Sequence, residues 1–236
     1  MKKGYNAAEV YGNYTKIEYI EELELTDDQK EEVKKKINEI KIDNYEDSYK
    51  RGEALEQLIR YIVESSGIFK CTLNKHTSSN EFDLLVKLNI KGKCLRADNI
   101  IPEWVPDKFL IECKNKKDPA NVELVGKFYS LIKQSKIQLG LFISKNSITG
   151  KFNKDKKPER YWKEAMAFIN KINLKYSESN NQIILLDLDL NDLNILIEEK
   201  SKSFIELIED RKDQLEMDVN SSLKEWMKPH ENSGLF

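Results

Sequence analysis

Short apolar segments that alternate with segments of helical periodicity set the fold class of this 236-residue chain. Five of the apolar segments have the length and the β-branched or aromatic content of strands. They lie at residues 68–73, 82–88, 108–114, 138–144 and 182–188. The first three follow one another, which indicates a meander, whereas the last two alternate with helical segments, which indicates parallel crossovers. We therefore expect an α/β fold in which helices flank a mixed β-sheet.

Apolar residues at helical spacing and capping residues mark the helices in the first half of the chain. Thr26 and Gln29 have the spacing of a capping box, which predicts the start of a charged helix. Leucine and isoleucine residues then form one apolar face between 49 and 65, and Gly67 ends that helix. The segment 92–107 is polar and contains proline, so we expect a loop there.

The second half of the chain is mainly helical by pattern. Asn121 is placed to cap a helix, and another helix is expected at 161–173, after a lysine-rich loop. The sequence 190–227 also has a helical pattern, with a break expected near Lys200. Its apolar residues recur mostly at four-residue steps, which suits packing on the domain or on a partner.

The composition excludes several classes of protein. Charged residues make up 34% and hydrophobic residues 39% of the chain, and the formal net charge is -2, which is typical of a soluble globular protein. No apolar run approaches the roughly 20 residues that cross a bilayer, and the N-terminus lacks the apolar core of a secretory signal. We therefore expect a cytoplasmic protein without a membrane anchor. The near-neutral net charge neither requires nor excludes nucleic-acid binding, because acidic elements elsewhere can balance the charge of a local basic groove.

The cysteine and histidine content gives little support to disulfide or zinc chemistry. Cys71, Cys94 and Cys113 are widely spaced and form no C-x-x-C pair, which argues against a disulfide framework and a structural zinc site. Cys71 and His76 could ligate a metal together, but two ligands do not complete a set. We prefer to interpret Cys71 as an ordinary core cysteine and His76 as a surface histidine.

The segment FLIECKN, residues 109–115, places an acid and a base in a strand that is otherwise apolar. Side chains along a strand alternate between the two faces of a sheet, so Glu112 and Lys114 should share one face while Cys113 points to the other. Asp83 lies on the polar face of the preceding strand. If the two strands are neighbours, Asp83 and Glu112 converge.

Two carboxylates that share a small site repel each other, and a divalent cation relieves that repulsion. Hard oxygen ligands without thiolates favour Mg²⁺ or Mn²⁺ over zinc. Lys114 would then lie beside the metal. There it could position a water molecule, help to deprotonate it, or stabilise the charge that develops on a phosphate.

Several stretches, in the same order along the chain, resemble the PD-(D/E)xK nuclease superfamily and, within it, the Mrr-like restriction endonucleases. The resemblance covers roughly residues 50–196. The similar stretches are GEALEQLIRYIVESSGIF for the first core helix, NEFDLL for the strand with the first acid, FLIECKN for the strand with the second acid and the lysine, ELVGKFYSLIKQSKIQLGLFIS for the next helix and strand, and IILLDLDLNDL for the closing strand.

This resemblance implies a restriction-endonuclease-like core and a Mg²⁺-dependent hydrolase of DNA phosphodiester bonds, in which Mn²⁺ can substitute. It implies that Asp83 and Glu112 are metal ligands, that the Cys113 backbone carbonyl is a third ligand, that Lys114 is the catalytic lysine and that Glu56 is an auxiliary acid. The expected organisation is a helical extension at 1–47, the nuclease core at 48–198 and a second helical extension at 199–236.

Simpler interpretations of the same residues stay open. Glu112 and Lys114 could form a salt bridge at a sheet edge, Asp83 could cap a turn, and Glu56 could be a solvated helix residue.

Pro106-Asp107 spells the PD of the motif name, but it is too close to Glu112 to lie on a preceding strand, so we interpret it as a turn. The lysine groups at 114–117 and 151–157 are more often solvated loops than phosphate contacts, although the first follows the proposed active strand.

The leading hypothesis is a DNA endonuclease of the restriction or phage-defence type. One active site cuts one strand, so cleavage of a duplex favours a homodimer, for which the C-terminal helices are a candidate surface. A second hypothesis is a repair or recombination nuclease that acts on branched or single-stranded DNA. A third is a non-cutting subunit that has a nuclease fold and binds DNA or a protein.

Overall fold

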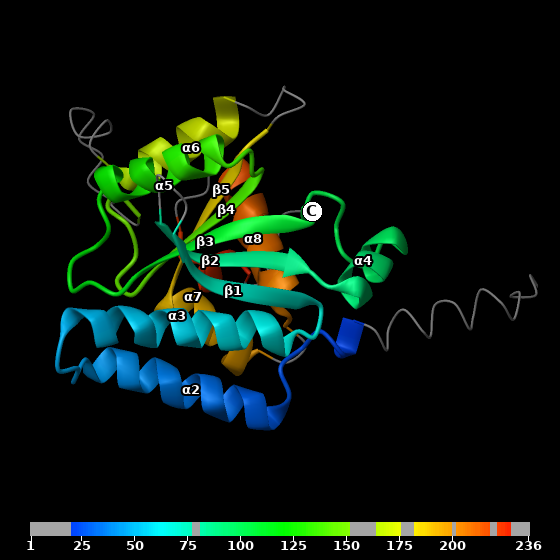
Figure 1. Ribbon diagram of the computed structural model, residues 1–236, viewed down its shortest axis with the longest axis horizontal. Coiled ribbons are helices and arrows are strands. Elements are labelled where there is room, and N and C mark those ends of the chain that lie inside the picture. The colour runs from blue at the N-terminus through cyan, green and yellow to red at the C-terminus, as the bar shows by residue number, and fades with distance from the viewer. Residues whose placement is uncertain are drawn as a thin grey trace, which may run out of the picture.

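The computed structural model describes residues 20–76, 81–151, 164–175, 182–199, 202–217 and 221–227. Its helices are α2 (Asp27–Ile42), α3 (Ser48–Ser65), α4 (Ile90–Ala97), α5 (Val122–Gln134), α6 (Ala165–Lys175), α7 (Leu190–Glu198), α8 (Phe204–Glu216) and α9 (Leu223–Trp226) (Figure 1). Its strands are β1 (Phe69–His76), β2 (Glu81–Leu88), β3 (Lys108–Lys114), β4 (Leu139–Ser144) and β5 (Ile184–Asp189).

The five strands form one mixed sheet in the order β1-β2-β3-β4-β5. The pairs β1–β2 and β2–β3 are antiparallel, whereas β3–β4 and β4–β5 are parallel. Every residue of β4 is buried, as expected for a strand with parallel neighbours and helices nearby. The predicted α/β fold with a meander followed by two parallel crossovers is confirmed.

Helices cover both sides of this sheet. α3 contacts β1, β2 and β3 through its apolar face, and α2 packs on the outside of α3, while α5 and α6 lie on the opposite side against β4 and β5 (Figure 1). Gly140 on β4 allows the close approach of α5, because a Cβ atom there would lie 2.1 Å from Ile132 Cδ1. The predicted caps are present, since Thr26 and Gln29 form the capping box of α2 and Asn121 caps α5.

The segment predicted as a loop at 92–107 is partly helical, so that prediction is wrong. Asn89 caps α4 through a hydrogen bond that its side chain accepts from the backbone of Gly92. Only Gly92 and Leu95 are buried within this helix, so no apolar period marks it in the sequence. A Cβ atom at Gly92 would lie 2.6 Å from the Ile68 carbonyl oxygen and 2.7 Å from Leu88 Cδ2, so the glycine permits close packing of α4 on the residue before β1 and on the end of β2.

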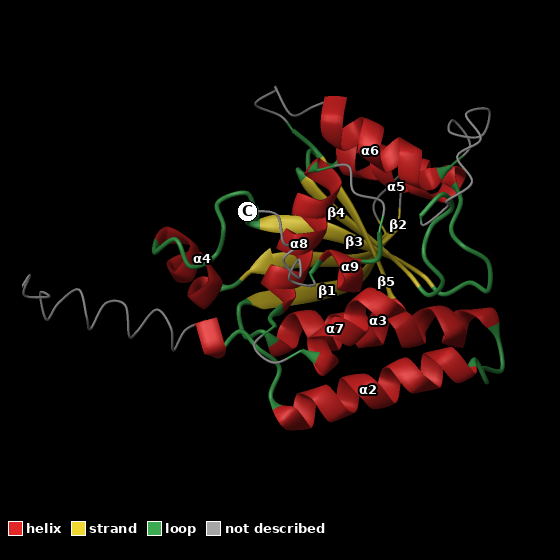
Figure 2. Cartoon of the chain, turned by 180° about the vertical axis from the view of Figure 1, so that it is seen from behind, coloured by secondary structure: helices red, strands yellow, loops and turns green. Residues whose placement is uncertain are grey.

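The C-terminal part of the described chain folds back on the domain as α7, α8 and α9. Viewed from behind, α8 lies across the strands with α7 and α9 beside it (Figure 2). The break expected near Lys200 falls between α7 and α8, and a second break separates α8 from α9. The C-terminal helices were a candidate dimer surface, and four of their apolar residues at helical spacing, Phe204, Ile208, Leu215 and Leu223, are buried within this chain, while Val219 lies outside the described residues. That face therefore packs on its own domain.

Other sequence predictions concern the membrane and the Cys71–His76 pair. Among the helices of the described residues, none is long and apolar enough to cross a membrane.

Cys71 is half-buried on β1 and its thiol is free, while the side chain of His76 lies outside the described residues. Burial raises the pKa of the Cys71 thiol to about 12, so the thiolate that binds metals is disfavoured.

Candidate functional site

The register between β2 and β3 brings the two proposed acids together. Leu84 pairs with Ile111 in this antiparallel ladder, so the next step places Asp83 opposite Glu112. Residues directly opposite each other point to the same face of a sheet, and Lys114 shares that face because it lies two residues after Glu112. The three side chains form what we call the Asp83–Glu112–Lys114 cluster.

The distances within the cluster show direct contact. Lys114 Nζ lies 2.5 Å from Glu112 Oε1 and 3.7 Å from Asp83 Oδ2. It also donates a hydrogen bond of 3.2 Å to the Cys113 carbonyl oxygen. Asp83 Oδ2 accepts a hydrogen bond of 2.7 Å from the backbone N–H of Cys113, which fixes the orientation of that carboxylate. Each of the three side chains keeps between 16% and 23% of its surface exposed, so solvent reaches the cluster.

Burial and neighbouring charges shift the pKa values of Glu112 and Lys114. Burial and the neighbouring Asp83 charge raise the pKa of Glu112 to about 7, although Lys114 acts in the opposite direction. Burial alone would lower the pKa of Lys114, but Glu112 and Asp83 outweigh it and raise that pKa above its ordinary value. Lys114 is therefore a cation at neutral pH. This protonation state favours a role in stabilising negative charge over a role as a base.

Glu56 lies near the cluster on the neighbouring helix α3. Its side chain is half-buried, and its charge adds to the causes that raise the pKa of Glu112. The helix start is tied to the end of β3, because Asn115 Nδ2 donates a hydrogen bond of 2.6 Å to the backbone carbonyl of Arg51. Glu56 is thus an electrostatic neighbour of Glu112, five residues after Arg51 along α3.

The donors around Lys114 fit a small divalent cation. The described residues contain no ready-made group of three or more His, Cys, Asp or Glu side chains that could hold a metal. However, Mg²⁺ is commonly bound through only one or two carboxylates, with water and substrate oxygens completing its shell. Here Asp83, Glu112 and the Cys113 carbonyl already surround one positive charge, the ammonium of Lys114. The Cys113 thiol is buried, and burial raises its pKa well above the ordinary value, so the backbone carbonyl is its only suitable donor.

Asp107, the acid of the PD dipeptide, lies at the opposite end of β3 from the cluster. Its carboxylate pairs with Arg96 at 2.5 Å, and its carbonyl oxygen accepts a hydrogen bond from the Leu88 backbone. It lies at a bend directly before β3 and not on a strand of its own, so Asp107 is not the first acid of the motif.

One lysine group contains a buried ion network that the sequence interpretation missed. Lys151 Nζ lies 2.8 Å from Asp192, 3.1 Å from Asp187 and 3.5 Å from Asp189, and Arg211 pairs with Asp187 at 2.6 Å. The interpretation of Lys151 as part of a solvated loop is therefore wrong, while residues 152–157 lie outside the described residues. Two aspartates within the apolar run IILLDLD were a usable signal, since buried carboxylates need positive partners.

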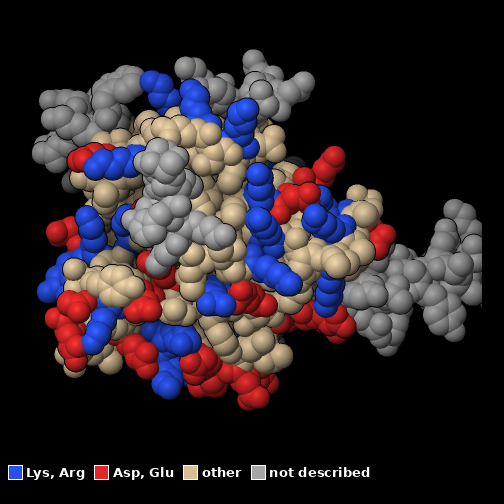
Figure 3. All heavy atoms as spheres, in the orientation of Figure 1, with Lys and Arg blue, Asp and Glu red and all other residues tan. Residues whose placement is uncertain are grey.

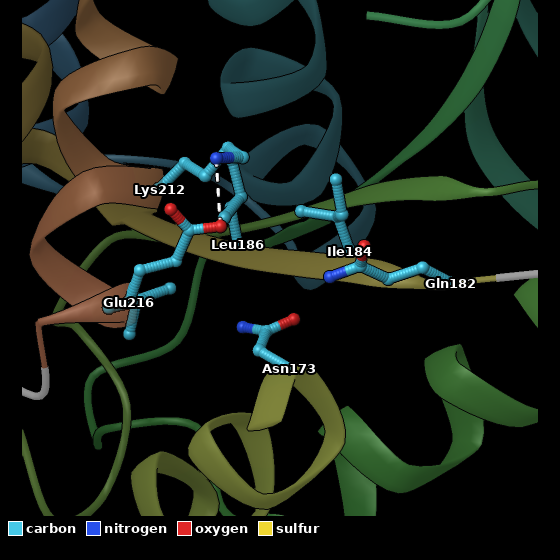
Figure 4. Close-up of a pocket in the computed structure, with 7 residues that line it drawn as sticks. Asn173, Gln182, Ile184, Leu186, Lys212 and Glu216 are labelled. Atoms are coloured by element: carbon cyan, nitrogen blue, oxygen red, sulfur yellow. Dashed lines mark ion pairs between the residues drawn. The ribbon is translucent and has the colours of Figure 1, made fainter. Parts of the chain in front are cut away.

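A pocket of about 270 Å³ lies beside β5, two strands away from β3 (Figure 4). Lys212 and Glu216 form an ion pair of 2.8 Å at its wall. The Asn173 carboxamide donates a hydrogen bond to the Leu185 carbonyl oxygen and accepts one from the Leu185 N–H. It therefore satisfies backbone groups of the edge strand β5. These contacts give the pocket wall a structural role at the sheet edge, apart from the cluster.

A comparison with known proteins gives one match. Residues 50–157 match the model of the Mrr catalytic-domain family, described as restriction endonuclease. No curated protein and no solved structure matches the chain. The matched residues extend from α3 through β4 and include Glu56 and the whole Asp83–Glu112–Lys114 cluster. The resemblance to Mrr-like nucleases is confirmed over this range.

Proposed function

We propose that the chain hydrolyses DNA phosphodiester bonds at the Asp83–Glu112–Lys114 cluster with Mg²⁺, for which Mn²⁺ can substitute; the match of residues 50–157 to the Mrr catalytic-domain family of restriction endonucleases supports this proposal. One observation carries the proposal: two carboxylates from neighbouring strands and a charged lysine meet on one face of the sheet, within 3.7 Å of the lysine nitrogen. This is the set of groups that phosphodiester hydrolysis with a divalent cation requires.

In the proposed mechanism, Asp83, Glu112 and the Cys113 carbonyl would hold the cation. When bound, such an ion polarises a phosphate oxygen and lowers the pKa of a bound water molecule. The backbone N–H of Cys113 keeps Asp83 oriented before substrate arrives. Lys114 Nζ donates to the Glu112 carboxylate. The Lys114 ammonium would also be placed to donate to a phosphate oxygen and to stabilise the charge that develops there.

Glu56 is proposed as an auxiliary acid. Its position on α3 is near enough to add negative potential at Glu112. The Glu56 carboxylate would accept a hydrogen bond from the attacking water molecule and so orient it. The restriction or phage-defence role and the homodimer are further parts of the proposal. Since the apolar face of α8 is already covered, a dimer would use another surface.

Metal affinity should depend on pH through Glu112. A proton competes with the cation for this carboxylate, whose pKa is about 7. Affinity for Mn²⁺ should therefore rise as pH increases through this value and should be about tenfold weaker at pH 6 than at pH 8. Calorimetric titration of the DNA-free protein with Mn²⁺ measures this. Glu123→Gln, which removes an exposed acid from α5, should retain the pH dependence. Glu112→Gln should remove it, and an unchanged profile in that variant would contradict the assignment.

The proposed activity can be tested by plasmid cleavage. Purified protein should cut methylated or unmethylated plasmid, or both, with Mg²⁺, and excess EDTA should stop the reaction. Asp83→Asn should lower the rate by on the order of a hundredfold or more, because it removes a charged ligand. Asp107→Asn is the matched control, since it changes an acid that pairs with Arg96 at the opposite end of β3 from the cluster, and it should cut at nearly the wild-type rate. Equal loss in both variants, or no cutting by the wild type, would refute the proposal.

A further inference from the structure

Three lysines stand in a row across the first three strands. Lys70 on β1 is the register partner of Lys87 on β2, and Lys87 is the register partner of Lys108 on β3. Residues directly opposite each other share a sheet face, so the three side chains form one row. All three are exposed. We call this row the lysine ladder.

The lysine ladder is unfavourable for the isolated fold. Like charges directly opposite each other on neighbouring strands are destabilising, and Lys87 has such a neighbour on both sides. Within the described residues, none of the three lysines pairs with a carboxylate, and the nearby Asp107 is engaged by Arg96 and Lys93. The row therefore presents positive charge that the described protein does not compensate, which suits a polyanion.

The lysine ladder and the Asp83–Glu112–Lys114 cluster share one face of the sheet. Lys87 lies four residues from Asp83 along β2, and Lys108 lies four residues from Glu112 along β3, so an even step keeps each pair on the same side. Four residues of strand span about 13 Å. Figure 3 shows Lys and Arg side chains gathered over the ends of these strands nearest α4. The positive row thus continues the face that carries the two acids.

We propose that the lysine ladder binds the phosphate backbone of the DNA that enters the cluster. The inference rests on the proposed function, and it adds a contact surface outside the reacting groups. Three strands spaced about 4.8 Å apart place the row across about 10 Å, enough to neutralise two or three phosphates. Contacts of this kind position the nucleic acid without reading its sequence.

The test compares two triple variants with equal charge change. Lys70→Gln/Lys87→Gln/Lys108→Gln removes the lysine ladder, whereas Lys34→Gln/Lys35→Gln/Lys41→Gln removes three exposed lysines from α2, on the outer side of α3. Fluorescence anisotropy of a labelled duplex in EDTA measures binding without cutting. The first variant should bind at least about tenfold more weakly at low salt, and the slope of log affinity against log salt should fall by about 2 to 3. The α2 variant should change affinity by less than about threefold.

Three further readouts separate a binding role from a structural one. The melting temperature of the lysine-ladder variant should be no lower than that of the wild type, because a repulsion has been removed. Cleavage in Mg²⁺ should show a raised KM with kcat within about twofold of the wild type, since the reacting groups are intact. Arginine at the three positions should restore binding, because it retains the charge.

The outcomes distinguish the lysine ladder from the proposed activity. A lysine-ladder variant that binds DNA like the α2 variant, with an unchanged salt slope, overturns the inference even if the wild type cuts DNA. A wild type that binds DNA through these lysines and never cuts refutes the activity and supports the binding surface. Binding to phosphatidylserine vesicles tests an anionic membrane as the alternative ligand. If the lysine-ladder variant loses binding to these vesicles but binds DNA as the wild type does, the assignment to nucleic acid is overturned.

Discussion

Lys114→Ala is expected to lower the rate of DNA cleavage by on the order of a thousandfold while the protein stays folded. Lys114 is the cation that contacts both Glu112 and Asp83, and its raised pKa keeps it charged at neutral pH. Removing a preorganised positive group that faces a developing phosphate charge has effects of this size in other enzymes. Single-turnover cleavage with saturating protein and Mg²⁺ measures the chemical step directly.

The fold should tolerate this substitution for a specific reason. The pKa of Glu112 is already about 7, so a proton can replace the ammonium when Lys114 is absent. Lys127→Ala is the matched control, because it removes a lysine that pairs with Glu123 on the exposed side of α5. The control should cut at the wild-type rate, and circular dichroism should be the same for all three proteins. Equal cleavage by Lys114→Ala and the wild type would rule out the proposed role of this lysine.

The cluster could be predicted because it depends on local rules. The two-residue period of a strand places Glu112 and Lys114 on one face, and the alternation in EFDLLVKL places Asp83 on the polar face of its strand. Strands that follow one another along the chain usually pair, which brings the two faces together. The register itself, with Leu84 opposite Ile111, was not predictable from either segment alone. It depends on the packing of both strands against α3.

Other features depend on contacts that sequence patterns do not encode. α4 has only two buried residues, so it has too little apolar periodicity for detection. The lysine ladder consists of single lysines on three strands, and only the register makes them neighbours. Lys151 begins a lysine-rich stretch that is typical of a solvated loop. Its burial results from the meeting of this segment with the end of β5 and the start of α7.

Lys151→Met is expected to lower the free energy of unfolding by about 3–5 kcal/mol, which is the usual cost of removing one partner from a buried ion network. Lys151 is buried, and Asp187 and Asp192 raise its pKa despite the opposing effect of burial. Methionine fills a similar volume but leaves Asp187, Asp189 and Asp192 with Arg211 as their one remaining cation within the described network. Urea unfolding at pH 7, followed by circular dichroism, measures the loss.

The pH dependence identifies the cause of that loss. Burial opposes ionisation of Asp187, but Arg211 and Lys151 bring its pKa down to about 2, so this carboxylate stabilises the wild type above pH 4 and less as pH falls towards 2. Without Lys151, Asp187 should take up a proton at higher pH, and the stability difference between variant and wild type should narrow as pH falls from 7 to 5. Lys34→Met, which breaks an exposed pair with Glu31, should cost less than about 1 kcal/mol at every pH. If Lys151→Met is as stable as this control, the buried network contributes little to the free energy of unfolding. If the loss of stability is independent of pH, it comes from packing and not from charge.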